Sequence, residues 1–298
     1  MRTEKRFTPD LLARFERLER GQGTHENYIP WHRVGRGDPA SIGRSHLHEW
    51  RGRHCELLSD KELIYYFFTT MLNNLYDVRE QFPLTLESSE HELSKYKIGE
   101  FSSDFPGTLE IAAKFSFKHP KCHGNKKSTN WRMTTDFLLT FMLPNGELLL
   151  LALAVKLDGE VDKKRTRQLL AIERQYWFER NVEWLLLTPA LYHPLIADLL
   201  SCTRYWGLSS KVEDESIQFA VSHSASWEGR SLTFALYDLT EKFGDLDHAQ
   251  RIFWQAVWSG QLRLELRRGW RPHEPLRFLS EEAFGNLNPV AARRSAWI

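Results

Sequence analysis

The sequence predicts an α/β protein in which a mixed sheet flanked by helices is followed by a second, mainly helical domain of the winged-helix type. Three observations support this. Up to Pro189, apolar stretches with helix or strand spacing follow one another in the order helix, strand, hairpin, helix and strand. Residues 144–146 separate two apolar runs, which indicates a hairpin turn. After Pro189 helical segments predominate. We therefore expect two domains, residues 1–189 and 190–298.

Capping residues and periodicity indicate the N-terminal elements. Thr8-Pro9 predicts the start of a helix that continues to about residue 18. Residues 24–57 are rich in Gly, His and Arg, and we expect them to be irregular. Apolar residues at helical spacing predict a helix from Ser59 to about Leu75, and the segment from Tyr76 to Leu84 should be extended.

The central hairpin determines how two polar residues of the sheet meet. Strands are predicted at Thr134–Leu143 and Glu147–Leu157. A two-residue turn would put residue 136 opposite residue 155, so Asp136 and Lys156 should meet to within one residue. Because strict alternation would leave these two side chains on opposite faces of the sheet, a three-residue loop or a bulge is required.

The remaining elements complete both domains. Further helices are predicted within 85–110 and at about 162–180, 193–201, 230–242 and 247–258. A buried strand, Val182–Leu187, should end the sheet of the first domain. In the second domain an alternating stretch, 262–266, precedes a basic turn, 267–272. A helix followed by a basic two-stranded hairpin is typical of a winged helix, which would contact DNA or a partner.

The composition is that of a folded protein without an overall charge excess. The chain has 298 residues, of which 42% are hydrophobic and 27% charged, and its formal net charge is +1. Between Ile111 and Thr135, however, basic residues occur without any acidic residue, and a second basic cluster follows at 163–167. Such runs are usually solvated surface, but these two flank the candidate site, where a polyanion would need them. The backbone-contact candidates are Lys114, Lys118, Lys121, Lys126, Lys127 and Arg132.

Nothing in the sequence indicates export or a membrane span. The three cysteines are far apart and give no disulfide framework. The N-terminus carries acidic residues and does not fit a signal peptide. The longest uninterrupted apolar run, Leu148–Val155, is too short to cross a bilayer. We therefore expect a cytoplasmic protein.

Glu62, Asp136 and Lys156 together suggest a metal-dependent phosphodiesterase. Carboxylates bind divalent metals, and a lysine beside the attacking water or the scissile phosphate completes such a site. Two of these residues also have simpler explanations: Glu62 fits a capping box with Ser59, and Lys156 could reach solvent from a strand end. Asp136 is harder to explain in that way, because a carboxylate in an apolar strand is rarely buried without a partner.

Two groups of histidines and cysteines raise the question of zinc. Their spacing matches no closed four-ligand pattern, so solvated or phosphate-contacting histidines are the better interpretation. No phosphate-binding glycine loop and no nucleophile elbow occurs in the sequence. The two groups are His46, His48, His54 and Cys55, and His119, Cys122 and His123.

Motifs spread over roughly residues 20–190 carry a family resemblance. The most specific are Arg79-Glu80-Gln81-Phe82-Pro83-Leu84 and Lys118-His119-Pro120. The others are Arg20-Gly21-Gln22-Gly23, Asn27-Tyr28-Ile29-Pro30-Trp31, Gly43-Arg44-Ser45-His46, Leu57–Leu63, Thr134–Leu138, Val155-Lys156 and Glu173-Arg174-Gln175-Tyr176-Trp177. In these motifs the chain resembles the TnsA endonuclease subunits of heteromeric cut-and-paste transposases, which have a restriction-endonuclease-like fold. Its second domain is similar to theirs only in layout.

The resemblance implies a role for each site residue. Glu62 and Asp136 would be metal ligands, with Asp136 bridging two Mg²⁺ ions that Mn²⁺ can replace. The Val155 carbonyl would complete a coordination shell, and Lys156 would orient or activate the attacking water.

Other positions of the matched motifs are less regular. The family usually has glutamine or an acidic residue two positions before the lysine, where this chain has Ala154. Glu80 and Glu173 lie in matched motifs and are candidate supporting carboxylates. The basic stretch from Lys114 to Arg132 would hold the DNA backbone without reading bases.

The resemblance also implies a process and partners. The chain would cut the 5′ ends of a mobile element on bacterial DNA. A TnsB-type recombinase would cut the 3′ ends, and a TnsC-type ATP-dependent regulator would contact the C-terminal domain. Two alternatives stay open: a catalytically weak DNA-binding scaffold subunit, which Ala154 favours, and a stand-alone host-defence nuclease of the same fold.

Overall fold

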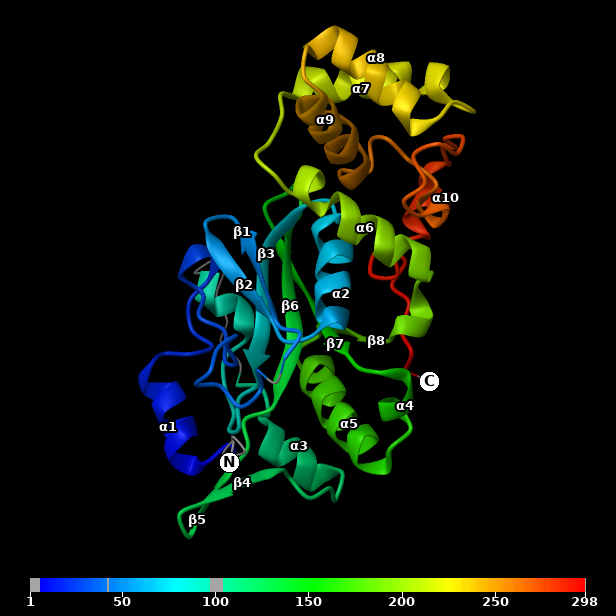
Figure 1. Cartoon of the computed structure of the whole chain (residues 1–298). Helices are drawn as coiled ribbons and strands as arrows, with labels where there is room; N and C mark the ends of the chain where they lie inside the picture. The colour runs from blue at the N-terminus through cyan, green and yellow to red at the C-terminus, as the bar shows by residue number, and fades with distance from the viewer. Residues whose placement is uncertain (1–5, 42, 97–103, 298) are drawn as a thin grey trace. The chain divides into compact units, whose positions relative to one another are not determined.

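The computed structural model describes residues 6–41, 43–96 and 104–297 (Figure 1). The chain divides into two compact units. The first comprises residues 1–63, 74–188 and 296–298, and the second comprises residues 64–73 and 189–295. The second unit therefore begins inside the helix α2 (Asp60–Thr70), and the last residues of the chain belong to the first unit.

A four-stranded mixed sheet forms the centre of the first unit. Its strand order is β3-β6-β7-β8, with β7 and β8 parallel and the other pairs antiparallel. The helices α3 (Thr108–Lys114) and α5 (Lys164–Glu179) share an apolar core with residues of these strands. The strands are β3 (Leu75–Pro83), β6 (Thr134–Met142), β7 (Leu148–Val155) and β8 (Glu183–Leu187). The structure confirms the predicted mixed sheet flanked by helices.

The β6–β7 hairpin has a three-residue loop. Phe137 is paired with Leu153, and the register continues to Met142 and Leu148. The Leu143 amide then donates to the Glu147 carbonyl at 2.8 Å, which leaves residues 144–146 in the loop. Gly146 takes a φ of +83°, a conformation that glycine adopts without strain. Of the two possibilities, the loop is therefore the one that occurs.

Two hairpins lie outside this sheet, and one corrects a prediction. Residues 24–57 are not irregular throughout, because β1 (His46–Trp50) pairs with β2 (Arg53–Leu57). Their tight turn has positive φ at both Arg51 and Gly52, 43° and 86°. Such turns usually carry Asn-Gly, so the Arg51-Gly52 sequence is only a weak signal for a hairpin. A second unpredicted hairpin joins β4 (Lys121–Gly124) to β5 (Lys127–Asn130).

The other elements of the first unit agree in outline with the sequence. The helix α1 begins where expected, since the Thr8 hydroxyl accepts a hydrogen bond from the Leu11 amide at 3.2 Å. The helix α2 ends at Thr70, short of Leu75, because Leu75 is already paired with Phe141 in the sheet. The remaining elements are α1 (Pro9–Arg17), η1 (His25–Asn27), η2 (Glu92–Tyr96) and α4 (Asp158–Val161).

The end of the chain returns to β8. The Ala296 amide donates to the Leu186 carbonyl at 2.7 Å. The Trp297 ring packs edge-on against Trp184, with ring centroids 5.7 Å apart, and the Arg167 guanidinium lies over Trp297. These contacts make the last residues part of the first unit.

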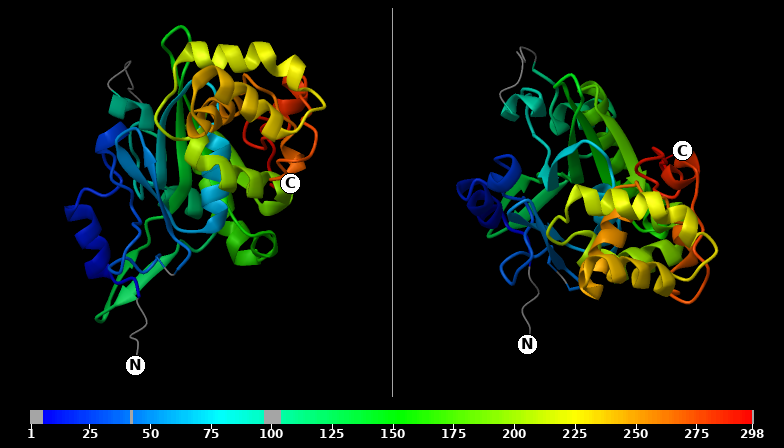
Figure 2. Two further views of the ribbon diagram at one scale, coloured as in Figure 1. Left: turned by 45° about the horizontal axis from the view of Figure 1, so that its top comes forward. Right: turned by 90° about the horizontal axis from the view of Figure 1, so that it is seen from above.

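The second unit is built around α9 (orange in Figure 2). Most of the residues of this helix are buried. The helices α6, α7 and α8 contact α9. Its elements are η3 (Pro189–Leu191), α6 (Pro194–Gly207), α7 (Asp214–Trp227), α8 (Leu232–Phe243), α9 (Leu246–Trp258), η4 (Leu266–Arg268) and α10 (Glu281–Gly285). The sequence analysis missed α7.

Of the predicted winged hairpin, residues 189–295, all of which are described, contain one antiparallel bridge and no named strand. Leu264 is bridged to Phe278, and backbone hydrogen bonds at 2.8 Å run from the Glu265 amide to the Arg277 carbonyl and from the Leu279 amide to the Arg263 carbonyl. The Glu265 carboxylate accepts from the Arg267 amide at 3.0 Å and caps the short helix η4, so the extended backbone ends after only a few residues. The strand expected at 262–266 is thus reduced to this bridge, and the winged-helix assignment stays a prediction.

No helix among the described residues is long and apolar enough to cross a membrane.

Candidate active site

Asp136 and Lys156 meet at the ends of two neighbouring strands, as the sequence predicted. Asp136 lies beyond the last registered pair of β6 and β7. Its Oδ2 accepts hydrogen bonds from the Val155 amide at 2.6 Å and from Lys156 Nζ at 2.9 Å. The same ammonium donates to the Val155 carbonyl at 2.9 Å. A carboxylate, an ammonium and a carbonyl thus converge on one point of the sheet.

Glu62 completes the capping box and also feels the charge of Asp136. As a capping residue, it donates its amide to Ser59 Oγ at 3.2 Å, and Ser59 Oγ donates back to Oε1 at 3.0 Å. Its Oε2 accepts from the Leu58 amide at 2.9 Å. The side chain is nevertheless 8% exposed, and its pKa is raised to about 7 by burial and by the negative charge of Asp136. Glu62 and Asp136 therefore lie in one electrostatic environment.

Gln81 contacts Glu62 and was missed by the sequence analysis. Its Nε2 donates to Glu62 Oε2 at 3.0 Å from a buried position in β3. Its backbone has a φ of +48°, unusual for a residue other than glycine within a strand, and its carbonyl accepts from the Trp31 amide at 3.2 Å. The side-chain direction thus depends on a local distortion. Only its place in the motif Arg79–Leu84 could have drawn attention to it.

Glu173 is a buried neighbour of the lysine. Its Oε1 accepts from Thr135 Oγ1 at 2.9 Å and from Trp184 Nε1 at 3.1 Å. Burial raises the pKa of Glu173 to about 7, although the Lys156 charge opposes this. Burial alone would lower the pKa of Lys156, but the charges of Asp136 and Glu173 outweigh it, so its pKa is raised. Lys156 therefore keeps its proton at neutral pH.

The structure places Glu80 in an ion pair. Its two oxygens accept from the Arg53 guanidinium at 2.8 and 2.7 Å, and its Oε1 also accepts from the Glu56 amide at 2.9 Å. The side chain is 0% exposed. These contacts give Glu80 a structural role, because they hold the Arg53 side chain and the Glu56 amide. Ala154, which replaces the expected polar residue, is also buried, in the apolar core that α3 and α5 share with the sheet.

The donor set suits a hard divalent cation. No cluster of three or more His, Cys, Asp or Glu side chains with metal-binding geometry occurs among the residues that the structure describes. Two carboxylates and a carbonyl remain, and Mg²⁺ commonly binds so few protein oxygens because it retains several waters. The pKa of Glu62 is raised partly by Asp136, and a cation at these oxygens would relieve that repulsion.

The histidine groups have other contacts. His46 Nε2 lies 2.9 Å from Asp60 Oδ1, and His48 is paired with Cys55 across the β1–β2 hairpin. In the second group, the His119 ring lies 3.0 Å from the Pro120 carbonyl and 3.1 Å from Thr108 Oγ1.

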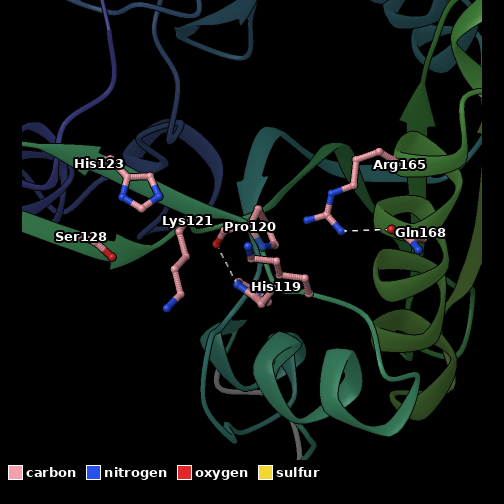
Figure 3. A pocket seen from close by; sticks show the side chains of 8 residues that line it. His119, Pro120, Lys121, His123, Ser128, Arg165 and Gln168 are labelled. Atoms are coloured by element: carbon pink, nitrogen blue, oxygen red, sulfur yellow. Dashed lines mark hydrogen bonds between the residues drawn. The ribbon is translucent and has the colours of Figure 1, made fainter.

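The basic residues of the stretch 111–135 divide into two sets. Three are paired: Lys114 with Glu110 and Glu179, Lys127 with Asp10, and Arg132 with Glu16. Lys118 and Lys121 line an open pocket of about 600 Å³ with Arg165 from α5 (Figure 3). No ion pair of Lys118, Lys121 or Lys126 occurs within the described part of the chain. The other residues that line this pocket are His119, Pro120, His123, Ser128 and Gln168.

Two comparisons relate this chain to known proteins. Residues 73–189 match the family model of the TnsA-like endonuclease N-terminal domain, a range that includes Asp136, Lys156 and Glu173. The transposon Tn7 transposition protein TnsA of Escherichia coli is 30% identical over 214 residues, which cover 71% of this chain and 67% of that protein. The chain therefore belongs to the TnsA endonuclease family.

Proposed function

We propose that this chain is the metal-dependent DNA endonuclease subunit of a transposase and cuts the 5′ ends of a mobile element during cut-and-paste transposition. Membership of the TnsA family supports the nuclease activity, and the name of the Tn7 relative supports transposition as the process. The observation that carries the proposal is the convergence of Asp136, Lys156 and the Val155 carbonyl, with Glu62 in the same electrostatic environment.

Each residue has a chemical task in this proposal. Glu62, Asp136 and the Val155 carbonyl provide the oxygen donors that Mg²⁺ and Mn²⁺ prefer. Divalent metal held by these oxygens would supply Lewis-acid stabilisation of the phosphate charge. Lys156 is held by Asp136 and the Val155 carbonyl and keeps its proton. It therefore orients the attacking water or stabilises the phosphate as a cation, and does not act as a base.

Glu173 supports this arrangement electrostatically, because its charge helps to keep Lys156 protonated. The pocket of Lys118, Lys121 and Arg165 would contact the DNA backbone, which gives affinity without reading sequence. Sequence specificity would then come from a TnsB-type recombinase that reads the element ends. A TnsC-type regulator would contact the second unit.

Strand-specific cleavage of an end-labelled element end tests the proposal. In the assembled complex with Mg²⁺, Asp136→Ala should abolish 5′-end cleavage and should still fold, because the buried apolar residues Phe137 and Leu138 beside it stay in place. Glu62→Gln should also inactivate, whereas a pure capping role predicts full activity, because glutamine can still accept from the Leu58 amide and Ser59. Normal cleavage by a folded Asp136→Ala variant would refute the active site.

The second candidate function, a catalytically weak DNA-binding scaffold, is favoured by one observation: Ala154 is buried among apolar side chains and offers no ligand. The same assay separates the two functions. A wild-type chain that binds element ends but shows no Asp136-dependent cutting in the complete complex, with Mg²⁺ or Mn²⁺, would be a scaffold.

Dependence on partners is a separate expectation. The isolated chain should cut poorly and without preference for element ends, because its basic residues are placed for backbone contact. Specific and efficient cutting by the purified chain alone would instead identify a self-sufficient nuclease, such as a defence enzyme.

A further inference from the structure

We propose that a second pocket of the first unit, lined by Arg79, binds a phosphate monoester or inorganic phosphate. The pocket has a volume of about 270 Å³ and does not include the site residues Glu62, Asp136 or Lys156. Arg79 is the remaining charged residue of the motif Arg79–Leu84. Its neighbour Glu80 accepts hydrogen bonds from Arg53, and Gln81 donates one to Glu62. For Arg79, in contrast, Nε and Nη2 are buried without a hydrogen-bond partner.

The Arg79 guanidinium is buried without a hydrogen-bond acceptor among the described residues. The residue is 1% exposed, and both Nε and Nη2 lack a partner. The rings of Phe82 and Tyr96 lie 4.8 and 5.2 Å from the guanidinium carbon. Aromatic rings attract the cation but provide no oxygen for its N–H groups. Buried charged donors without an acceptor are costly, so a ligand that brings oxygen atoms to these N–H groups would be favoured.

The charges around the pocket favour an anion. Lys95 and Arg132 line it together with Arg79, against two carboxylates, Glu90 and Glu92, which leaves a formal charge of +1 from three cations and two anions. One carboxylate and one cation of this set are already engaged. Glu92 Oε1 accepts from the Arg180 guanidinium at 3.0 Å, and Arg132 is paired with Glu16 at 3.2 Å. Lys95 is exposed and forms no ion pair within the described ranges.

Phosphate fits both the donors and the space. An arginine edge binds two phosphate oxygens side by side, and a lysine at the rim adds a point charge. The cavity of about 270 Å³ admits a phosphate and some hydration but is too small for a duplex. The ligand is therefore a free phosphate or one at the end of a nucleotide or strand. The competing explanation is that water alone fills the pocket, without preference for anions.

Calorimetric titration of the full chain with inorganic phosphate at constant ionic strength tests the proposal. Wild type should bind saturably, Arg79→Gln should lose that binding, and Lys95→Glu should weaken it about fivefold. Lys211→Ala, an exposed substitution in the second unit, should bind like wild type. The assignment would be overturned if wild type showed no saturable binding. It would also be overturned if Arg79→Gln and Lys95→Glu both bound phosphate as tightly as wild type. Should Arg79→Gln not fold, Lys95→Glu decides, because this side chain is exposed.

Competition separates the two sources of phosphate. A short single strand with a 5′-phosphate should displace inorganic phosphate if the site takes strand ends, and a 5′-hydroxyl strand of the same sequence should not. Displacement by neither strand identifies free phosphate as the ligand and also supports the site. Equal displacement by both strands means that internal backbone is bound, and this contradicts a site for phosphate monoesters.

Discussion

Glu80→Ala should destabilise the protein strongly while leaving the chemistry of the site in place. The substitution removes two hydrogen bonds from Arg53, at 2.8 and 2.7 Å, and one from the Glu56 amide at 2.9 Å. Arg53, which is 8% exposed, would keep its charge without the carboxylate. Breaking a buried ion pair in this way costs about 3–5 kcal/mol. We therefore expect a loss of about that size in the free energy of unfolding.

This loss can be measured by urea denaturation of the full chain, with tryptophan fluorescence as the probe of unfolding. An exposed ion pair provides the matched control: Lys211 and Asp214 lie 2.8 Å apart with 74% and 77% of their side chains exposed. Asp214→Ala should cost less than about 1 kcal/mol. The double variant Arg53→Met with Glu80→Leu should recover most of the stability, because it leaves no unpaired charge. A loss for Glu80→Ala as small as that of the control would refute the structural role.

Three further predictions concern single positions. Gln81→Met should lower the cleavage rate at least about tenfold, because Glu62 loses a charge-assisted hydrogen bond. DNA affinity should change little, and a parallel loss of DNA affinity would contradict a positioning role. Gly21→Ala should lower the melting temperature, since its φ is +82° and a Cβ would lie 2.1 Å from Pro83 Cγ; an unchanged melting temperature would contradict this. Burial raises the pKa of Asp38, but neighbouring hydrogen bonds outweigh it and lower the pKa from 3.8 to about 2. Its contribution of about 2 kcal/mol should be complete above pH 3.8 and disappear as the pH falls through 2, and Asp38→Asn should flatten this part of the stability profile.

The sequence predicted those parts of the site that depend on the order of elements. Asp136 and Lys156 meet because a hairpin joins their strands, and turn residues and apolar runs reveal a hairpin. Gln81 could not be placed in this way, because its direction toward Glu62 comes from a positive φ within β3 that tertiary contacts impose. The winged hairpin stays a prediction, because the alternating stretch 262–266 forms a single bridge, to Phe278, and no longer strand.

The return of the chain end to β8 makes the nuclease unit discontinuous in sequence. A fragment cut at residue 189, as the predicted boundary suggests, would lack the Ala296 hydrogen bond to Leu186 and would uncover Trp184 where Trp297 now packs. Trp184 in turn donates to Glu173, the carboxylate that supports Lys156. Removing residues 296–297 would therefore disturb the surroundings of Glu173, and low activity of such a fragment would not demonstrate a need for partners.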